Sequence, residues 1–374
     1  MEGEERQDQL LIGGKFASTE PMAKLFEPLQ IGSVTLRNRM AVSPMCQYSS
    51  EDGFANDWHL VHLGSRAVGG AGLIIFEATA VSPEGRITPD DLGIWKDEHL
   101  PFLQRINTFI KTQGAITGVQ LAHAGRKASH HSPWKGGHAL AENEGAWQTV
   151  GPSAIPFREG MPAPEELTRE GIRKVIDDFK KATVRALDAG FDLIEIHAAH
   201  GYLLHEFYSP LSNQRNDEYG GPFQNRIRLT VEIVAAVKEL VPNDFPLLVR
   251  ISATDWVEGG WTIDDSVELA KELKTAGVHL IDCSSGGNIH ANIPVRPMYQ
   301  ADFAERIRKE AGMITGAVGL ITSAAEAESI LQNEGADLII LARQFLRDPY
   351  FPLHAARELE TDVAWPAQYL RAKN

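Results

Sequence analysis

The chain has 374 residues, of which 43% are hydrophobic and 23% are charged, and its formal net charge is -14. Such a chain can bury an ample core. Its negative charge argues against binding to nucleic acid or to an anionic membrane surface, because both attract cations. The two cysteines, Cys46 and Cys283, are too few for a disulfide framework or a zinc cluster, so we expect a reducing compartment.

The start of the chain is polar and acidic. Residues 1–24 contain no apolar run of the kind that a signal peptide needs, and no later stretch is long and apolar enough to cross a bilayer. We therefore expect a cytoplasmic protein in which residues 1–24 form a loose extension and residues 25–374 form a single domain.

The first predicted element is a short hairpin within residues 25–38 that turns at Gly32 and Ser33. After it, apolar runs of strand length alternate with amphipathic runs of helical period. The predicted strands are residues 40–44, 73–79, 116–121, 191–197, 247–252, 280–284, 314–318 and 338–342. The predicted helices are residues 60–68, 99–111, 169–189, 225–240, 263–276, 301–311 and 323–333.

This alternation predicts a parallel sheet with helical crossovers. Eight strands favour a closed (β/α)8 barrel over an open doubly wound sheet, and no Gly-x-Gly-x-x-Gly fingerprint follows an early strand. One connection, residues 122–168, is much longer than the others and rich in Gly, Pro, His and Trp. We expect it to lie over the C-terminal mouth of the barrel as a lid.

The fourth predicted strand has a polar face. With a two-residue period, Leu193, Glu195 and His197 point to one side. His200 and Tyr202 follow just past the C-terminal end, where barrels of this kind bind their ligands. Two neutral imidazoles can hydrogen-bond to one oxygen, and a phenol can deliver a proton. A buried core histidine and a packed tyrosine are the alternative, and no third ligand at a suitable spacing supports a metal site.

Other strand ends carry groups that suit a phosphorylated cofactor. Gln120 can pair with an amide-like ring edge, and Arg250 brings a fixed positive charge, unless it forms an ion pair with Glu195. Small residues after the seventh and eighth strands, together with Arg343, are typical of the phosphate site of this fold. A surface salt bridge is the alternative for Arg343. Flavin mononucleotide (FMN) fits these groups.

Six short motifs, each weak alone, form a specific set. They are SPMCQY at 43–48, QLAHAGRK at 120–127, HAAHGY at 197–202, the run 209–221, RIS at 250–252 and TGAVG at 315–319. With them the chain resembles, from residue 25 to about 371, the Old Yellow Enzyme family of flavin ene-reductases, in particular its bacterial branch with a cysteine near the flavin.

The resemblance implies a (β/α)8 barrel that binds FMN non-covalently and is reduced by NADPH or NADH. It implies that the enzyme then reduces the activated C=C bond of an α,β-unsaturated carbonyl or nitro compound. By this resemblance His197 and His200 hold the substrate oxygen, and Tyr202 protonates the substrate carbon. The residues implied to line the substrate site are Tyr48, Cys46, Lys127 and Arg371. The residues implied to contact FMN are Pro44, Cys46, Ala78, Gln120, Arg250, Gly319, Ala342 and Arg343.

Some of these residues have simpler roles as alternatives. Cys46 could be a small buried hydrophobe, and Lys127 could be a solvated lysine. The resemblance implies that Arg371 reaches into a neighbouring subunit of a homodimer or homotetramer; a disordered terminus is the alternative. Ala342 stands where relatives often have glycine, so its methyl group could tighten the phosphate pocket.

Other functions stay open from the residues alone. One is another FMN barrel oxidoreductase similar to a dienoyl-CoA reductase, although two distant cysteines cannot bind the iron–sulfur cluster of those larger relatives. Another is a flavin-based redox sensor that uses Cys46. A cofactor-free lyase or metallohydrolase would need a lysine at the end of an inner strand or a third metal ligand, and neither is evident.

Overall fold

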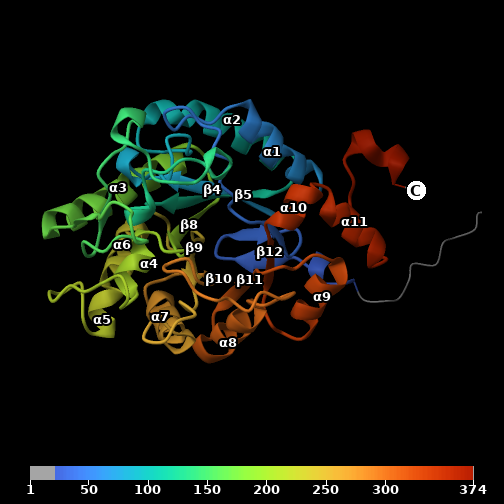
Figure 1. Ribbon diagram of the computed structural model, residues 1–374. Helices are drawn as coiled ribbons and strands as arrows, with labels where there is room; N and C mark the ends of the chain where they lie inside the picture. The colour runs from blue at the N-terminus through green and yellow to red at the C-terminus, as the bar shows by residue number, and fades with distance from the viewer. Residues whose placement is uncertain (1–21, 374) are drawn as a thin grey trace, which may run out of the picture.

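Eight parallel strands close into one barrel in the computed structural model, which describes residues 22–373 (Figure 1). The predicted (β/α)8 barrel is confirmed, and each predicted strand overlaps an observed one. In order around the barrel the strands are β3 (Met40–Val42), β4 (Leu73–Ala80), β5 (Ile116–Ala122), β8 (Leu193–Ala198), β9 (Leu247–Ser252), β10 (Leu280–Ser284), β11 (Ile314–Ala317) and β12 (Leu338–Leu341).

Helices surround this barrel, as Figure 1 shows. The longer ones are α1 (Asp57–Val68), α2 (Leu100–Thr112), α3 (Arg169–Asp188), α6 (Arg228–Lys238), α7 (Ile263–Thr275), α8 (Ala301–Ala311) and α9 (Ala324–Gln332). The shorter ones are α4 (Leu203–Tyr208), α5 (Phe223–Arg226), α10 (Arg343–Arg347) and α11 (Phe351–Glu358). The helix predicted at 225–240 is divided at Ile227, which separates α5 from α6.

The barrel strands are buried on both faces, so their side chains alternate between two cores. One core lies between the strands and the surrounding helices. The other lies inside the barrel and includes Leu193, Leu248 and Leu280. The predicted hairpin, β1 (Leu29–Ile31) and β2 (Val34–Leu36), adds side chains to this inner core. The hairpin therefore closes one end of the barrel.

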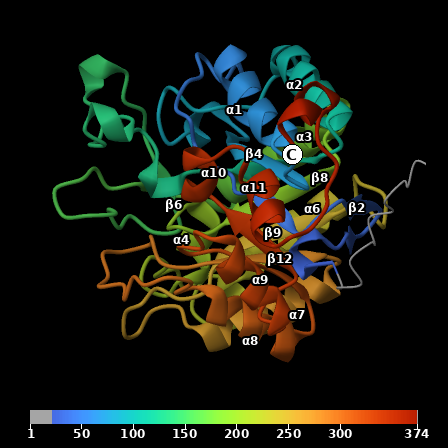
Figure 2. The ribbon, with the colours of Figure 1, turned by 90° about the vertical axis from the view of Figure 1, so that its right-hand side faces the viewer.

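The long connection at residues 122–168, here called the lid segment, lies at the other end of the barrel. Figure 2 shows it around β6, opposite the hairpin at β2. It contains small elements of its own, namely η4 (Gly125–Lys127), η5 (Pro133–Lys135), η6 (Glu142–Glu144), β6 (Val150–Gly151) and β7 (Glu165–Glu166). The C-terminal mouth of the barrel is thus framed by the lid segment.

The extension predicted at residues 1–24 lies outside the described residues, except for its last three. Lys24 begins the short helix η1 (Lys24–Phe26), and its backbone N–H donates to Glu328 of α9 at 2.9 Å. Among residues 22–373, no helix is long and apolar enough to cross a membrane.

Candidate active site

The three predicted catalytic residues lie together at the C-terminal end of β8. The ring centroids of His197 and His200 are 5.3 Å apart, and those of His197 and Tyr202 are 5.0 Å apart. His197 is buried on the strand, whereas His200 and Tyr202 are partly buried on the turn that leads into α4. The strand and the turn therefore place two imidazoles and a phenol at one edge of the barrel.

The protonation states of these groups follow from their surroundings. Burial, and next the charge of Arg250, holds the pKa values of His197 and His200 well below the ordinary histidine value. Both imidazoles are therefore neutral at pH 7. Burial raises the pKa of Tyr202, so its phenol keeps its proton. Neutral imidazoles and a protonated phenol can each donate a hydrogen bond to an oxygen, and the phenol can also transfer its proton to a carbon.

One histidine has a partner and the other does not. Nε2 of His200 lies 2.6 Å from the hydroxyl oxygen of Ser284, at the end of β10. The side chain of His197 has no hydrogen bond within the described part of the chain, and its Nδ1 is buried. A buried polar atom without a partner is unfavourable, which points to a ligand as the missing partner.

Lys127, predicted at the substrate, is partly buried, and its ammonium group has hydrogen-bond partners within the protein. Its Nζ donates to the carbonyl oxygens of His200 at 2.8 Å and Gly287 at 3.0 Å. The same ammonium group lies 5.0 Å from the ring centroid of Tyr202. Burial lowers the pKa of Lys127 to about 8. Lys127 thus supports the segment that carries His200 and Tyr202.

Cys46 and Tyr48 follow β3 on the same side of the barrel. Burial raises the pKa of the Cys46 thiol well above its usual value, and the carboxyls of Asp91 and Glu77 raise it further. The thiol therefore stays protonated, unlike the thiolates of redox-reactive cysteines. Tyr48 lines a pocket under the lid segment together with Lys127.

The alternative interpretation of Arg250, an ion pair with Glu195, is wrong. Its Nε lies 3.3 Å from Oδ2 of Asp282, and its Nη1 donates to Ser43 at 3.1 Å. Glu195 instead accepts a hydrogen bond from Nε2 of Gln120 at 2.8 Å. The reason is the strand order: β9 pairs with β10 in a register that sets Arg250 beside Asp282.

A second pocket opens where β10, β11, β12 and β3 end. It is lined by the predicted residues Arg250, Gly319, Ala342 and Arg343, and by Arg347. Gly319 has a φ of +108°, and a Cβ there would lie 3.0 Å from side-chain atoms of Gln300. Only glycine suits this turn. Two guanidinium groups beside a glycine turn are chemically suited to a phosphate.

The remaining predicted residues occupy separate places. Pro44 follows β3, and Ala78 pairs with Gln120 across β4 and β5. Cys283 is a buried core residue. Arg371 lies exposed in η7 (Ala367–Ala372) and lines neither the pocket under the lid segment nor the second pocket.

Two polar residues of β10 were missed by the sequence analysis. Asp282 and Ser284 share the face of the strand that points into the barrel, and they contact Arg250 and His200. The sequence does contain a pattern that indicates them. Asp282 and Ser284 are two positions apart in an otherwise apolar strand and so share one face, as Glu195 and His197 do.

The chain is similar to known proteins over nearly its whole length. Residues 24–362 match the family described as NADH:flavin oxidoreductase / NADH oxidase. An NADPH dehydrogenase of Bacillus velezensis is 52% identical over 351 residues, which cover 93% of this chain and 99% of that protein. An NADPH dehydrogenase of Bacillus subtilis is 51% identical over 350 residues, with 93% and 98% covered.

Solved structures show the same fold. Morphinone reductase in complex with tetrahydroNAD has a TM-score of 0.76 and 28% identity, and the match covers 93% of each chain. The old yellow enzyme homologue from Zymomonas mobilis has a TM-score of 0.75 and 26% identity, with 91% of this chain and 94% of that chain covered. The chain therefore belongs to the Old Yellow Enzyme family of NADH:flavin oxidoreductases, and it is a flavin oxidoreductase.

Proposed function

We propose that the protein is an FMN-dependent NADPH dehydrogenase that reduces the activated C=C bond of α,β-unsaturated carbonyl or nitro compounds. The observation that carries the proposal is the cluster of neutral His197, neutral His200 and protonated Tyr202. The Bacillus relatives, which are NADPH dehydrogenases, support NADPH as the hydride donor, and NADH is the alternative donor.

The residues of this chain fit FMN. Arg343 and Arg347 line the second pocket and suit a phosphate, and Arg250 lines the same pocket. Gln120 and Arg250 offer an amide and a fixed charge to the polar edge of a flavin ring. When bound, FMN supplies hydride transfer from the nicotinamide to the alkene.

The side chains at the end of β8 polarise the substrate and protonate it. The imidazoles of His197 and His200 donate hydrogen bonds to the carbonyl or nitro oxygen, and this withdraws electron density from the alkene. Because both rings are neutral, they polarise the oxygen without giving it a proton. Tyr202 delivers a proton to the substrate carbon next to the activating group, as a positioned general acid. Because its pKa is raised, the phenol of Tyr202 is protonated between turnovers.

The alternative functions are less well supported. A flavin-based redox sensor needs a reactive thiolate, whereas burial keeps Cys46 protonated. An enzyme similar to a dienoyl-CoA reductase needs an iron–sulfur cluster, and Cys46 and Cys283 are the two cysteines of the chain. The net charge of -14 favours small molecules over nucleic acid or membranes as partners, and the two free cysteines favour the cytoplasm.

We also propose a homodimer or homotetramer in which Arg371 reaches the substrate site of a second copy. Two observations support this. Arg371 is exposed in η7, and it lines neither the pocket under the lid segment nor the second pocket of its own chain. A second copy would bring the guanidinium to a site that already holds neutral hydrogen-bond donors.

The test is an absorbance spectrum of the purified protein with added FMN, followed by anaerobic titration with NADPH and then with 2-cyclohexen-1-one. We expect a flavin band that NADPH bleaches and the enone restores. A protein that gains no flavin band, or a reduced flavin that the enone does not reoxidise, would refute the proposal.

A further inference from the structure

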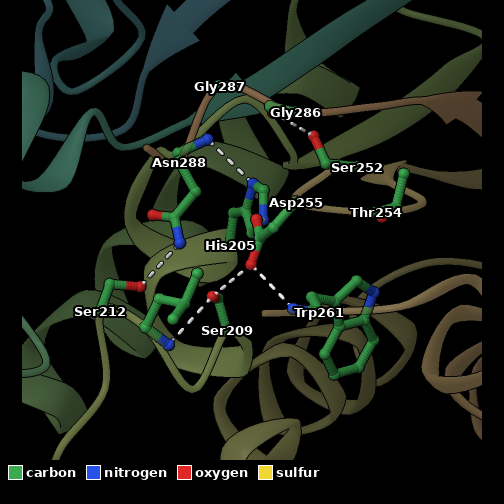
Figure 3. A network of polar contacts seen from close by, with 12 residues as sticks. His205, Ser209, Ser212, Ser252, Thr254, Asp255, Trp261, Gly286, Gly287 and Asn288 are labelled. Atoms are coloured by element: carbon green, nitrogen blue, oxygen red, sulfur yellow. Dashed lines mark hydrogen bonds and ion pairs between the residues drawn. The ribbon is translucent and has the colours of Figure 1, made fainter. Parts of the chain in front are cut away.

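Figure 3 shows a buried imidazole–carboxylate pair, His205 and Asp255. The pair contacts the segment that carries His200 and Tyr202 through the backbone of Gly201. His205, in α4, is 0% exposed and Asp255, after β9, is 1% exposed. Nε2 of His205 lies 2.8 Å from Oδ1 of Asp255. Neither residue lines the pocket under the lid segment or the second pocket, so the proposed chemistry gives this pair no role.

The segment in front of the pair has an unusual backbone. His200 and Gly201 are two consecutive residues in the left-handed region, with φ values of +59° and +74°. A non-glycine residue seldom adopts this conformation. A Cβ on Gly201 would lie 2.2 Å from the carbonyl oxygen of Gly287. The turn therefore depends on the contacts that hold it.

Each backbone N–H of this turn has its own acceptor. That of His200 donates to the hydroxyl oxygen of Ser252 at 2.9 Å, and that of Tyr202 donates to the carbonyl oxygen of Ala199 at 3.2 Å. The N–H of Gly201, between the two functional side chains, donates to Nδ1 of His205 at 2.9 Å.

This contact fixes the tautomer of His205. Because Nδ1 accepts a hydrogen bond, it carries no proton, and the ring proton is on Nε2 and points to Asp255. The carboxylate of Asp255 is itself held by the hydroxyl of Ser209 at 2.6 Å and the backbone N–H of Trp261 at 2.9 Å (Figure 3). Asp255 thus orients the ring so that Nδ1 faces Gly201.

We propose that His205 and Asp255 are positioning residues for His200 and Tyr202. The pair holds the peptide N–H of Gly201, and through it the two side chains that bind the substrate oxygen and deliver the proton. This role rests on the proposed function, since it is exerted through those two residues. A buried pair that serves only stability is the competing possibility.

Two substitutions at position 205 separate these possibilities. In His205→Asn the amide oxygen lies about where Nδ1 was, so Gly201 keeps an acceptor while the contact to Asp255 is lost. In His205→Gln the longer amide reaches Asp255 but leaves no acceptor at Gly201. Both variants lose the buried contacts of the imidazole ring, so each serves as the matched control of the other for that loss.

The first measurement is hydrogen–deuterium exchange of residues 199–204 in the flavin-loaded enzyme. A lost buried hydrogen bond of about 1.4 kcal/mol corresponds to about tenfold. We expect exchange about tenfold faster in His205→Gln and close to the wild-type rate in His205→Asn. Equal exchange in the two variants, or wild-type exchange in His205→Gln, would overturn the positioning role.

The second measurement is reoxidation of the reduced flavin by 2-cyclohexen-1-one. We expect about a tenfold slower rate in His205→Gln and a change below about threefold in His205→Asn. Equal rates in the two variants would contradict the proposal. If NADPH reduces the wild-type enzyme but the enone does not reoxidise it, the proposed function is refuted. The hydrogen–deuterium exchange of the two variants still tests the positioning role of His205 in that case.

A milder variant tests Asp255 without removing a buried charge. Ser209→Ala deletes one of the hydrogen bonds that orient the carboxylate. We expect exchange of residues 199–204 to rise about threefold, in line with the loss of one such bond. Exchange at the wild-type rate would contradict the part assigned to Asp255, even if both variants at position 205 failed to fold.

Discussion

The guanidinium Nε of Arg250 lies 3.3 Å from Oδ2 of Asp282 inside the barrel, on the neighbouring strands β9 and β10. Glu195, on β8, is equally buried, and the charge of Asp282 acts on its carboxyl group. Burial raises the pKa of Asp282, and it raises that of Glu195 to about 8. Glu195 therefore keeps its proton at neutral pH, and Asp282 is the carboxyl group that lies beside the charge of Arg250.

This relationship predicts an effect on the flavin. The double substitution Glu195→Gln with Asp282→Asn leaves the charge of Arg250 unpaired, and an unpaired cation stabilises the reduced, anionic ring. We expect the two-electron potential to rise by about 30 mV, which corresponds to about 1.4 kcal/mol. Potentiometric titration measures this potential. The control is Cys283→Ala, on the opposite face of β10, which should leave the potential unchanged. An unchanged or lower potential would contradict the assigned role of the carboxyls.

Buried carboxyls also predict how stability depends on pH. Burial raises the pKa of Glu77, Glu195 and Glu206 to about 8, against 4.5 in an unfolded chain. Between these values the folded protein binds more protons than the unfolded one, so stability falls as pH rises. Buried His59 and His123, with pKa values lowered to about 4, act in the opposite direction, but only below about pH 6.5.

The free energy of unfolding should therefore decrease between about pH 6.5 and 8. Each such carboxyl contributes at most about 1.4 kcal/mol per pH unit. Urea unfolding at several pH values measures the slope, and Glu206→Gln should make it shallower. Stability that rises over this interval would show that these carboxyls are ionised in the folded protein.

Tyr202→Phe tests the proton donor. The variant should slow reoxidation of the flavin by 2-cyclohexen-1-one by about 10²-fold or more, since a positioned general acid contributes that much. Reduction of the flavin by NADPH should stay close to the wild-type rate, because that step needs no proton from the phenol. Stopped-flow absorbance separates the two half-reactions. An equal loss in both would assign Tyr202 to binding instead of proton transfer.

The fold could be predicted from the sequence because its signals are local. Each barrel strand is an apolar run between turn residues, and eight of them alternate with amphipathic helices. The positions of His197, His200 and Tyr202 followed from one further rule, namely that such barrels bind ligands at the C-terminal ends of their strands. Both steps use residues that are close together in the chain.

The contacts that the sequence did not reveal join distant residues. Asp282 faces Arg250 because of the register between β9 and β10, which no local pattern encodes. His205 and Asp255 are 50 positions apart, and their pairing depends on how α4 packs against the loop after β9. The direction of Lys127 depends on the path of the lid segment. Such pairings need the three-dimensional arrangement of the strands and loops.

Arg343→Ala tests the phosphate site. A charge-assisted hydrogen bond contributes about 1.5 to 3 kcal/mol, so we expect FMN to bind roughly 10- to 100-fold more weakly. Fluorescence titration of the apoprotein with FMN measures the change. Arg357→Ala, on the exposed side of α11, is the matched control and should bind FMN with wild-type affinity. Equal affinity of the two variants would place the phosphate elsewhere.

The proposed role of Arg371 predicts that two inactive variants restore each other's activity when their subunits are mixed. If its guanidinium reaches the site of a second copy, both Arg371→Ala and Tyr202→Phe homo-oligomers lose enone reduction. In a mixed oligomer, however, the chain that carries Arg371→Ala keeps its own Tyr202 and receives Arg371 from its neighbour. One complete site is thus rebuilt. We expect mixed subunits, exchanged and then separated by differing affinity tags, to recover a substantial share of wild-type turnover. If Arg371 acts in its own chain, mixing restores nothing, because neither chain then holds both residues. If it acts in no site, Arg371→Ala alone keeps the wild-type turnover. Either result would contradict the proposal.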